Sequence, residues 1–183
     1  MTDAISPKDI LDYWSSLGKE GWWTKNADVD EEIKTRFGAL HDQACFGKLD
    51  HWAKTADGAL ALIIILDQFS RNMFRGDARS FSQDQKALSI AAQAIDSGLD
   101  KELEGDLAVF LYMPYEHSEE IADQKRSVLL QHSLGASPEN LRAALQHREI
   151  IQRFGRFPHR NAVLGRHTTP AEQAYLDSGG FSG

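Results

Sequence analysis

The sequence is poor in cysteine and has no long apolar run, and each absence excludes a class of protein. It contains one cysteine, Cys45, in 183 residues, so an internal disulfide framework is impossible and nothing indicates an oxidising compartment. The longest apolar run, "ALALIIIL" at 59–66, is far shorter than the ~20 residues that cross a bilayer. The opening residues, MTDAISPKDI, contain no cationic and no apolar signal region. We therefore expect a cytoplasmic protein without membrane contact.

Positive charge is also in short supply. Lys and Arg number 20 against 27 Asp and Glu, which gives a formal net charge of −7. An acidic chain argues against nucleic-acid binding driven by bulk charge, so we expect no nucleic-acid partner. Hydrophobic residues make up 42% of the chain, a normal share for a globular protein. The length predicts one domain that spans residues 1–183.

Strand signals are missing, because no stretch alternates apolar and polar residues between turn residues. Helical periodicity covers most of the chain instead, and we predict an all-α fold. The expected helices span about 7–17, 28–46, 57–74, 84–98, 101–112, 115–134 and 138–154, with a last one from 170.

Several helix ends carry capping residues. A capping-box pattern occurs at 6–9 (SPKD) and again at 169–172 (TPAE), and 137–138 (SP) opens another helix. Gly18 is expected to end the first helix, and Pro114 to interrupt the chain before the helix at 115–134. Two helices have two candidate N-caps each: Asp28 or Asp30, and Ser82 or Asp84.

The helix at 57–74 is expected to lie at the centre of the fold, because the stretch 59–66 is apolar on every side. Neighbouring helices such as 101–112 and 115–134 are predicted to form antiparallel hairpins. Small residues at 87–98 allow the close packing of tetratricopeptide-type (TPR-like) solenoids, although no internal repeat of fixed period is present. We predict a TPR-like stack of helix hairpins around a central buried helix.

Two ionisable residues lie on the buried side of that central helix. At about 100° per residue, Asp67 and Arg71 continue the apolar stripe of Leu60 and Ile63, one turn apart from each other. Because an unpaired buried charge is costly, they need each other or a ligand. Either the pair is structural, or Asp67 orients Arg71 toward a pocket.

Histidines give two weaker signals. His117 and Glu120 have the i, i+3 spacing of two metal ligands on one helix, but a zinc site takes three or four, and completion by His159, His147 or Asp67 has no support in the sequence. We therefore expect no resident metal and no cofactor. His147 lies on the core-facing stripe of its helix, where a histidine is most often a structural residue with hydrogen-bond partners.

One segment is purely cationic. "RFGRFPHRNAVLGR", at 153–166, contains four arginines and His159, and no acid lies between Glu149 and Glu172. Pro158 favours a turn. Arginine forks suit carboxylates or phosphates, and histidine and asparagine add directional donors. The turn is therefore either an anion site or a set of cations that pair with the chain's own helix ends and acids, such as Glu116, Glu120 and Asp67.

Three long blocks resemble the signature blocks of a bacterial family catalogued as domain of unknown function 924. They are "LDQFSRNMFRG", "YMPYEHSE" and "HREIIQRFGRFPHRNAVLGRHTTPAE", and with "ILDYWSSLG" and "WWTKNADVDEEI" they cover nearly the whole chain. The resemblance implies an all-helical, TPR-like fold and no established activity. Ser70 departs from the family pattern, where proline is expected. The family's characteristic polar positions fall here on Asp67, Gln68, Arg71, Asn72, His117, Ser118, Glu119, His147, Arg148, Arg156, His159, Arg160, Asn161 and Arg166.

These observations lead to one main hypothesis, that a polar pocket binds a small anionic molecule. If the protein is an enzyme, His117 or His159 is the candidate general acid or base, since no nucleophile motif such as G-x-S-x-G is present. We predict that blocks 67–72, 112–119 and 156–166 converge on one cavity. The candidate ligand-binding residues are Asp67, Arg71, His117, Arg156, His159, Arg160, Asn161 and Arg166.

Two alternatives belong to other classes. The chain could be a TPR-like scaffold that binds a protein partner through a groove, with Trp22 and Trp23 as anchors. It could also be a metal-dependent enzyme.

Overall fold

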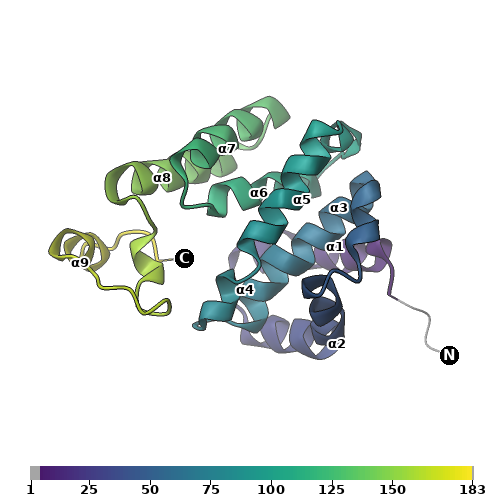
Figure 1. Ribbon diagram of the computed structural model, residues 1–183, viewed down its shortest axis with the longest axis horizontal. Coiled ribbons are helices and arrows are strands. Elements are labelled where there is room, and N and C mark those ends of the chain that lie inside the picture. The colour runs from purple at the N-terminus through teal and green to yellow at the C-terminus, as the bar shows by residue number, and fades with distance from the viewer. Residues whose placement is uncertain (1–4, 183) are drawn as a thin grey trace. The chain divides into compact units, whose positions relative to one another are not determined.

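The computed structural model describes residues 5–182, and within that range no β-strand is present, which confirms the all-α prediction (Figure 1). Contacts divide the chain into two compact units. The first comprises 5–75 and Arg79–Pro114, and the second comprises Gly76–Ala78 and 115–182. The prediction of one domain over 1–183 stays a prediction.

The first unit is built from α1 (Pro7–Trp23), α2 (Ala27–Cys45), α3 (Ala56–Ile63), α4 (Ser70–Met73) and α5 (Asp84–Asp96). Ser6 and Asp9 form the predicted capping box. Gly18 has a φ of 62° inside α1, so the helical path breaks there as expected and a further helical turn follows. Asn26, and neither Asp28 nor Asp30, is the N-cap of α2.

The centre of the first unit is one helical path formed by α3, a π-helical segment (Ile64–Phe69) and α4. Every residue of the apolar run 59–66 is buried, as predicted. The π-helix was not predicted; such wide turns are rare and often occur at functional sites. Phe69, the last residue of the π-helical segment, contacts the buried rings of Tyr13, Trp14 and Phe37.

Two predicted helices, 101–112 and 115–134, are wrong in their bounds. No α-helix covers 101–108, where 3₁₀ turns Leu99–Glu102 and Asp106–Ala108 replace it, because Gly98 and Gly105 take positive φ and interrupt the helix. α6 (Val109–His117) then runs through Pro114 without ending. The predicted helix 115–134 is therefore divided between α6 and α7 (Ile121–Leu134).

The break between α6 and α7 has a local cause. The Ser118 hydroxyl accepts a hydrogen bond from the Glu120 amide at 3.1 Å and donates one to Asp123 at 2.7 Å, which favours a turn. Gln124 Nε2 donates to the carbonyl oxygens of Glu116, near the end of α6, and Ser118, just after it, at 2.6 and 2.7 Å, so these carbonyls are satisfied without further helix.

The second unit contains a helix hairpin of α7 and α8 (Pro138–Phe154), followed by a 3₁₀ turn (Pro158–Arg160) and α9 (Pro170–Asp177) (Figure 1). α8 begins and ends at the predicted Ser137 cap and Gly155. α9 begins with the predicted capping box of Thr169 and Glu172. The core of this unit consists of Ile150, Ile151 and Phe157 with Phe154, Tyr175 and Phe181 packed against it. Within the described residues, no helix is long and apolar enough to span a membrane.

Candidate functional site

Arg156, in the cationic segment, is held by an acid that follows it in sequence. Its Nε and Nη2 donate to the two carboxylate oxygens of Glu172 at 2.6 and 2.8 Å, and Nη2 also donates to the His167 carbonyl at 2.7 Å. Glu172 is 2% exposed. The Arg156 hydrogen bonds, with those from Thr169, hold the pKa of Glu172 far below its ordinary value although burial opposes them. This pair fastens α9 to the turn after α8.

Arg166, at the other end of the segment, pairs with an acid that precedes it. Its two Nη atoms donate to the Glu119 carboxylate at 2.7 and 3.0 Å, and Nη2 also donates to the Phe157 carbonyl at 3.2 Å. Glu119 in turn accepts from the Phe157 amide at 2.8 Å. Burial raises the pKa of Glu119, but these hydrogen bonds outweigh it and lower the pKa. The pair fixes the turn to the start of α7.

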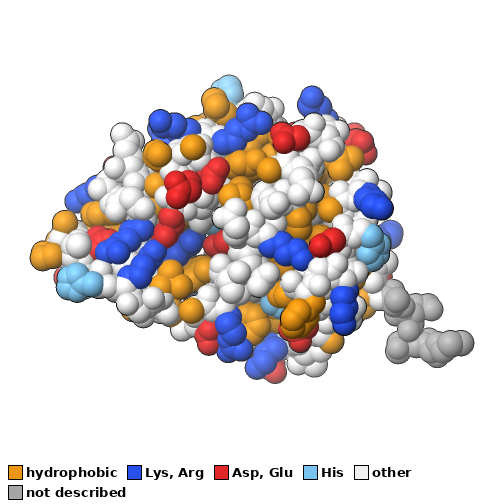
Figure 2. All heavy atoms as spheres, viewed as in Figure 1, with side chains coloured by type: hydrophobic (Ala, Val, Ile, Leu, Met, Phe, Trp, Pro, Cys, Tyr) orange, Lys and Arg blue, Asp and Glu red, His pale blue; other side chains and the backbone are white. Residues whose placement is uncertain are grey.

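These two ion pairs lie in a part of the chain where acidic and basic residues are equal in number. Residues 115–183 contain eight Asp and Glu and eight Lys and Arg, so the chain's net negative charge comes from residues 1–114. On the face shown in Figure 2, cationic side chains lie close to acidic ones. Arg156 and Arg166 therefore pair with the chain's own acids, which was one of the two predicted alternatives for the cationic segment. Their partners are Glu172 and Glu119, which were not among the acids predicted as partners.

The middle of the segment lies against aromatic rings. The Arg160 guanidinium carbon is 4.5 Å from the centre of the Phe157 ring, within the range of a cation–π contact. The His159 ring centre is 5.6 Å from that of Phe157. Arg160 is 6% exposed. A cation and an imidazole thus share one aromatic support.

Three histidines from three elements lie at or next to the Phe157 ring, and we call them the histidine cluster: His147 from α8 and His159 from the 3₁₀ turn contact the ring, and His117 from α6 contacts His147. The ring centres of His117 and His147 are 6.4 Å apart, and that of His147 is 5.4 Å from Phe157. Phe181, after α9, contacts His147 and His159 at ring-centre distances of 4.6 and 5.1 Å. Polar and aromatic groups far apart in sequence therefore form one site.

The surroundings of His147 determine where its proton lies. Its Nδ1 is 2.8 Å from the Ala143 carbonyl oxygen and 3.4 Å from a Glu116 carboxylate oxygen. Both neighbours are acceptors, so Nδ1 carries the hydrogen and, in the neutral ring, Nε2 is the basic nitrogen.

Arg71, in the first unit, is held by two acids. It donates to Asp67 Oδ1 at 3.1 Å and to both Asp84 oxygens at 2.9 and 3.0 Å. Burial lowers the pKa of Arg71, but Asp67 and Asp84 outweigh it and raise the pKa. Gln68 donates to Asp67 Oδ2 at 2.6 Å from the same π-helical segment. The predicted Asp67–Arg71 pair is thus present, and Asp84 at the start of α5 is an unpredicted third member.

The other predicted residues take distinct places. Asn161 is fully buried; its Nδ2 is 3.4 Å from Thr168 Oγ1, and a hydrogen bond from Asn161 also contributes to the lowered pKa of Glu172. Blocks 112–119 and 156–166 meet within the second unit, through Glu119 and the histidine cluster. That block 67–72 shares their cavity stays a prediction.

The predicted metal-ligand pair is wrong in its geometry. His117 ends α6, whereas Glu120 is the N-cap of α7, so they do not share a helix face. Within residues 5–182, no group of three or more His, Cys, Asp or Glu side chains is placed to hold a metal.

Trp22 and Trp23, the proposed protein-binding anchors, both contact the core of the first unit. Trp22 Nε1 donates to the Trp14 carbonyl at 2.6 Å. The Trp23 ring stacks on Phe110 with centres 5.6 Å apart and remains 50% exposed. Both tryptophans thus belong to the last turn of α1, and the packed part of each ring fastens that turn to the first unit.

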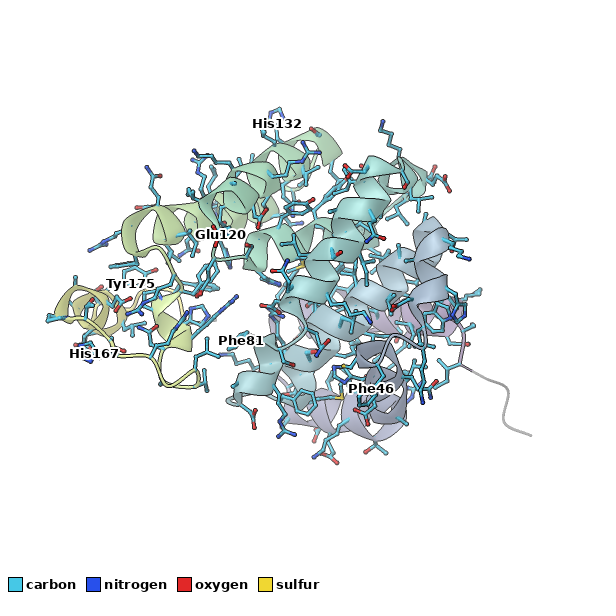
Figure 3. The ribbon with its side chains drawn as sticks, in the orientation of Figure 1. Phe46, Phe81, Glu120, His132, His167 and Tyr175 are labelled. Atoms are coloured by element: carbon cyan, nitrogen blue, oxygen red, sulfur yellow. The ribbon has the colours of Figure 1, made fainter. Side chains whose placement is uncertain are left out.

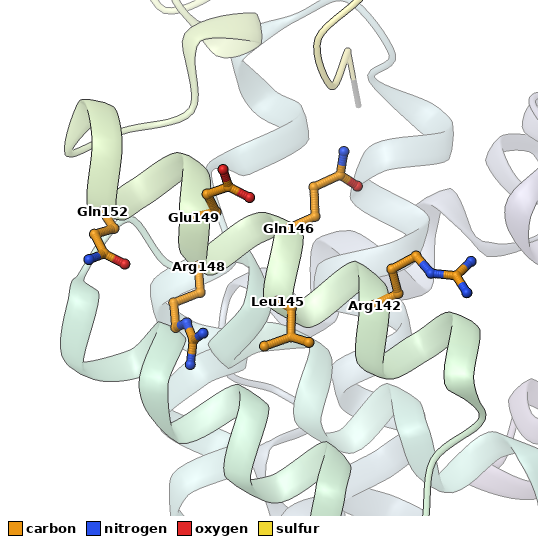
Figure 4. Close-up of a pocket in the computed structure, with 6 residues that line it drawn as sticks. All are labelled: Arg142, Leu145, Gln146, Arg148, Glu149 and Gln152. Atoms are coloured by element: carbon orange, nitrogen blue, oxygen red, sulfur yellow. The ribbon is translucent and has the colours of Figure 1, made fainter.

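A surface hollow of about 370 Å³ lies along the exposed side of α8 (Figure 4). It mixes cationic, acidic, amide and apolar side chains, and it does not include the histidine cluster. The lining residues are Arg142, Leu145, Gln146, Arg148, Glu149 and Gln152.

Sequence reasoning missed some members of these sites. The sequence predicted Glu172 only as a capping residue. Its position three residues after Thr169 does not indicate an ion pair with Arg156. Asp84 was seen only as a helix start. Phe181 stands in a glycine-rich stretch with no periodic signal, and only a three-dimensional arrangement brings it to His147.

Comparisons with known proteins agree with this description. The chain has a TM-score of 0.90 and 42% identity to the structure of the protein of unknown function ATU0120 from Agrobacterium tumefaciens, over 94% of this chain and 97% of that one. No curated protein matches it. A family model described as "Bacterial protein of unknown function (DUF924)" matches residues 10–180. The chain therefore belongs to this bacterial family of unknown function.

Proposed function

We propose that the protein binds a small anionic molecule at the histidine cluster and Arg160. The observation that carries the proposal is that His147, His159 and Arg160 converge on the Phe157 ring within one unit, with His117 beside His147. Imidazole N–H groups and a guanidinium fork are donors suited to phosphate or carboxylate oxygens. We further propose a cytoplasmic setting, in keeping with the low cysteine content.

Within this proposal the arginines have different tasks. Arg156 and Arg166 are engaged in bidentate pairs with Glu172 and Glu119, so they position the turn. Arg160 and His159 lie between them on the Phe157 ring and supply donors to the ligand. The predicted set of ligand-binding residues is thereby narrowed to His117, His159 and Arg160, and His147 lies beside them with Nε2 as a proton acceptor.

If the bound molecule is also transformed, His147 is the residue that we propose as general base. Glu116 and the Ala143 carbonyl fix its tautomer, which leaves Nε2 as the basic nitrogen. His117 and His159 remain candidates for the partner acid.

A thermal-shift panel of phosphates and carboxylates tests binding. A ligand at 100 times its Kd stabilises a protein by about 2.7 kcal/mol, or roughly 5–10 °C for a chain of this size. Arg160→Ala should lose most of that shift relative to its own ligand-free melting temperature. Arg142→Ala, on the exposed side of α8, is the matched control and should retain it. A panel in which no anion separates wild type from Arg160→Ala would rule the proposal out.

A second candidate function is protein binding through the exposed side of α8. It is favoured by the hollow there and by the 38% exposure of Leu145 on its wall. A photocrosslinking residue in place of Leu145 should trap one defined protein, and Arg148→Glu should abolish the product. The same residue in place of Phe46, which is 80% exposed at the end of α2 (Figure 3), is the control position; equal products from both positions would exclude a specific surface.

A further inference from the structure

The chain after α9 is turned back sharply by two glycines. Gly179 has a φ of 79°, and the amides of Gly179 and Gly180 donate to the carbonyls of Leu176 and Tyr175 at 3.1 and 3.0 Å. This is the hydrogen-bond pattern of a Schellman motif. A Cβ atom at Gly180 would lie 2.6 Å from the Tyr175 ring, so only glycine permits this close approach.

The turn delivers Phe181 to the histidine cluster. The Phe181 amide donates to Tyr175 Oη at 2.9 Å. Its ring meets His147 at 63° and His159 at 81°, both edge-to-face. Phe181 is only partly buried, so it lies at the outside of the cluster, and not in the middle of the core.

We propose that Phe181 is a hinged cover over His147 and His159. A backbone hydrogen bond and ring contacts hold it, and the Gly179–Gly180 pair gives the backbone freedom to swing it aside. When the cover is open, a small anion reaches His159 and Arg160; when it closes, the ring screens the bound anion from water. The choice of ligand class rests on the proposed function, whereas the cover itself can be tested without any ligand.

The test is the rate at which diethyl pyrocarbonate modifies each histidine, followed by peptide mass spectrometry. His132 on α7 and His167 before α9 are exposed and serve as internal references (Figure 3). In Phe181→Ala, the rates at His147 and His159 should rise roughly tenfold, as expected from the loss of two aromatic pairs. The reference rates should stay unchanged. Phe46→Ala, which removes an exposed ring, is the matched control and should alter none of them.

A second variant is needed because Phe181→Ala could destabilise the whole second unit. Tyr175→Phe keeps the ring and removes only the hydroxyl that accepts from Phe181, so it should raise the same two rates by a smaller factor. The urea midpoint is measured for each variant. Rates that do not change, or that rise at all histidines in proportion to a fall in the midpoint, would overturn the cover.

Inorganic phosphate separates this inference from the proposed function. If phosphate protects His147 and His159 but Phe181→Ala leaves the unliganded rates unchanged, the anion site stands and the cover fails. If Phe181→Ala raises the rates but neither phosphate nor a carboxylate protects the histidines, the cover stands and the anion site fails.

Discussion

Replacing Glu172 by glutamine should destabilise the second unit by about 2 kcal/mol at pH 7. The carboxylate accepts two hydrogen bonds from Arg156, at 2.6 and 2.8 Å. A hydrogen bond to a charged group contributes about 1.5–3 kcal/mol, and the Arg156 side chain is 28% exposed, so solvent screening reduces its share. Glutamine keeps the capping pattern and one acceptor oxygen. The substitution therefore removes the charge with little loss of shape.

The pH dependence identifies the ionised carboxylate as the cause. The pKa of Glu172 is held below its ordinary value of 4.5 in the folded state, so below that pH the unfolded chain binds the extra proton and stability falls with falling pH. The wild-type advantage over Glu172→Gln should shrink by about 1.36 kcal/mol per pH unit. An advantage of about 2 kcal/mol is then lost near pH 3.

Urea unfolding followed by far-UV circular dichroism between pH 3 and 7 measures both effects. Glu149→Gln, an exposed carboxylate on α8 in the same unit, is the control and should change stability by no more than about 0.5 kcal/mol. A Glu172→Gln effect below that size at pH 7, or one that persists undiminished at pH 3, would refute the ion-pair reasoning.

Three further substitutions probe the first unit. Because all four tryptophans lie in this unit, tryptophan fluorescence measures its unfolding. Asp84→Asn should cost about 1–2 kcal/mol, since it weakens the paired hydrogen bonds to Arg71; an unchanged urea midpoint would contradict this. Ser70→Ala should cost about 1–3 kcal/mol, because the buried His41 Nε2 loses its partner at 2.8 Å; a neutral result would mean that the contact contributes nothing. Burial lowers the pKa of His41, so wild-type stability should fall as the pH drops below about 6.5, and His41→Gln should lack that fall between pH 7 and 5; parallel pH profiles would exclude His41 as the source.

The parts of the fold that could be predicted depend on residues close in sequence. The capping boxes at Ser6 and Thr169 and the start and end of α8 are local, because each is made within a few residues. The central helix was predictable because its apolar run is buried on all sides. Helix continuity through Pro114 was not, since it depends on packing that outweighs one missing amide hydrogen bond.

The sequence predicted many of the residues of the candidate site, but it did not predict which arginine pairs with which acid. Arg166 and Glu119 are 47 residues apart, and Arg156 and Glu172 are 16 apart, so only the folded turn selects these partners from the available acids. The π-helical segment at Asp67 is likewise a tertiary outcome, because its sequence continues an ordinary helical pattern.

The ion pairs of Arg156 and Arg166 explain how an acidic protein accommodates a cationic segment. Glu119, before the segment, pairs with Arg166, and Glu172, after it, pairs with Arg156, so two of its four arginines are neutralised without an acid inside the turn. These two clamps fix the backbone on both sides of residues 157–160. Arg160 and His159 are thereby held on the Phe157 ring, which His147 also contacts. The Phe157 ring thus carries one guanidinium and two imidazoles, those of Arg160, His159 and His147, and this grouping of donor-bearing side chains is the reason for proposing an anion site at residues 159–160 and not along the whole segment.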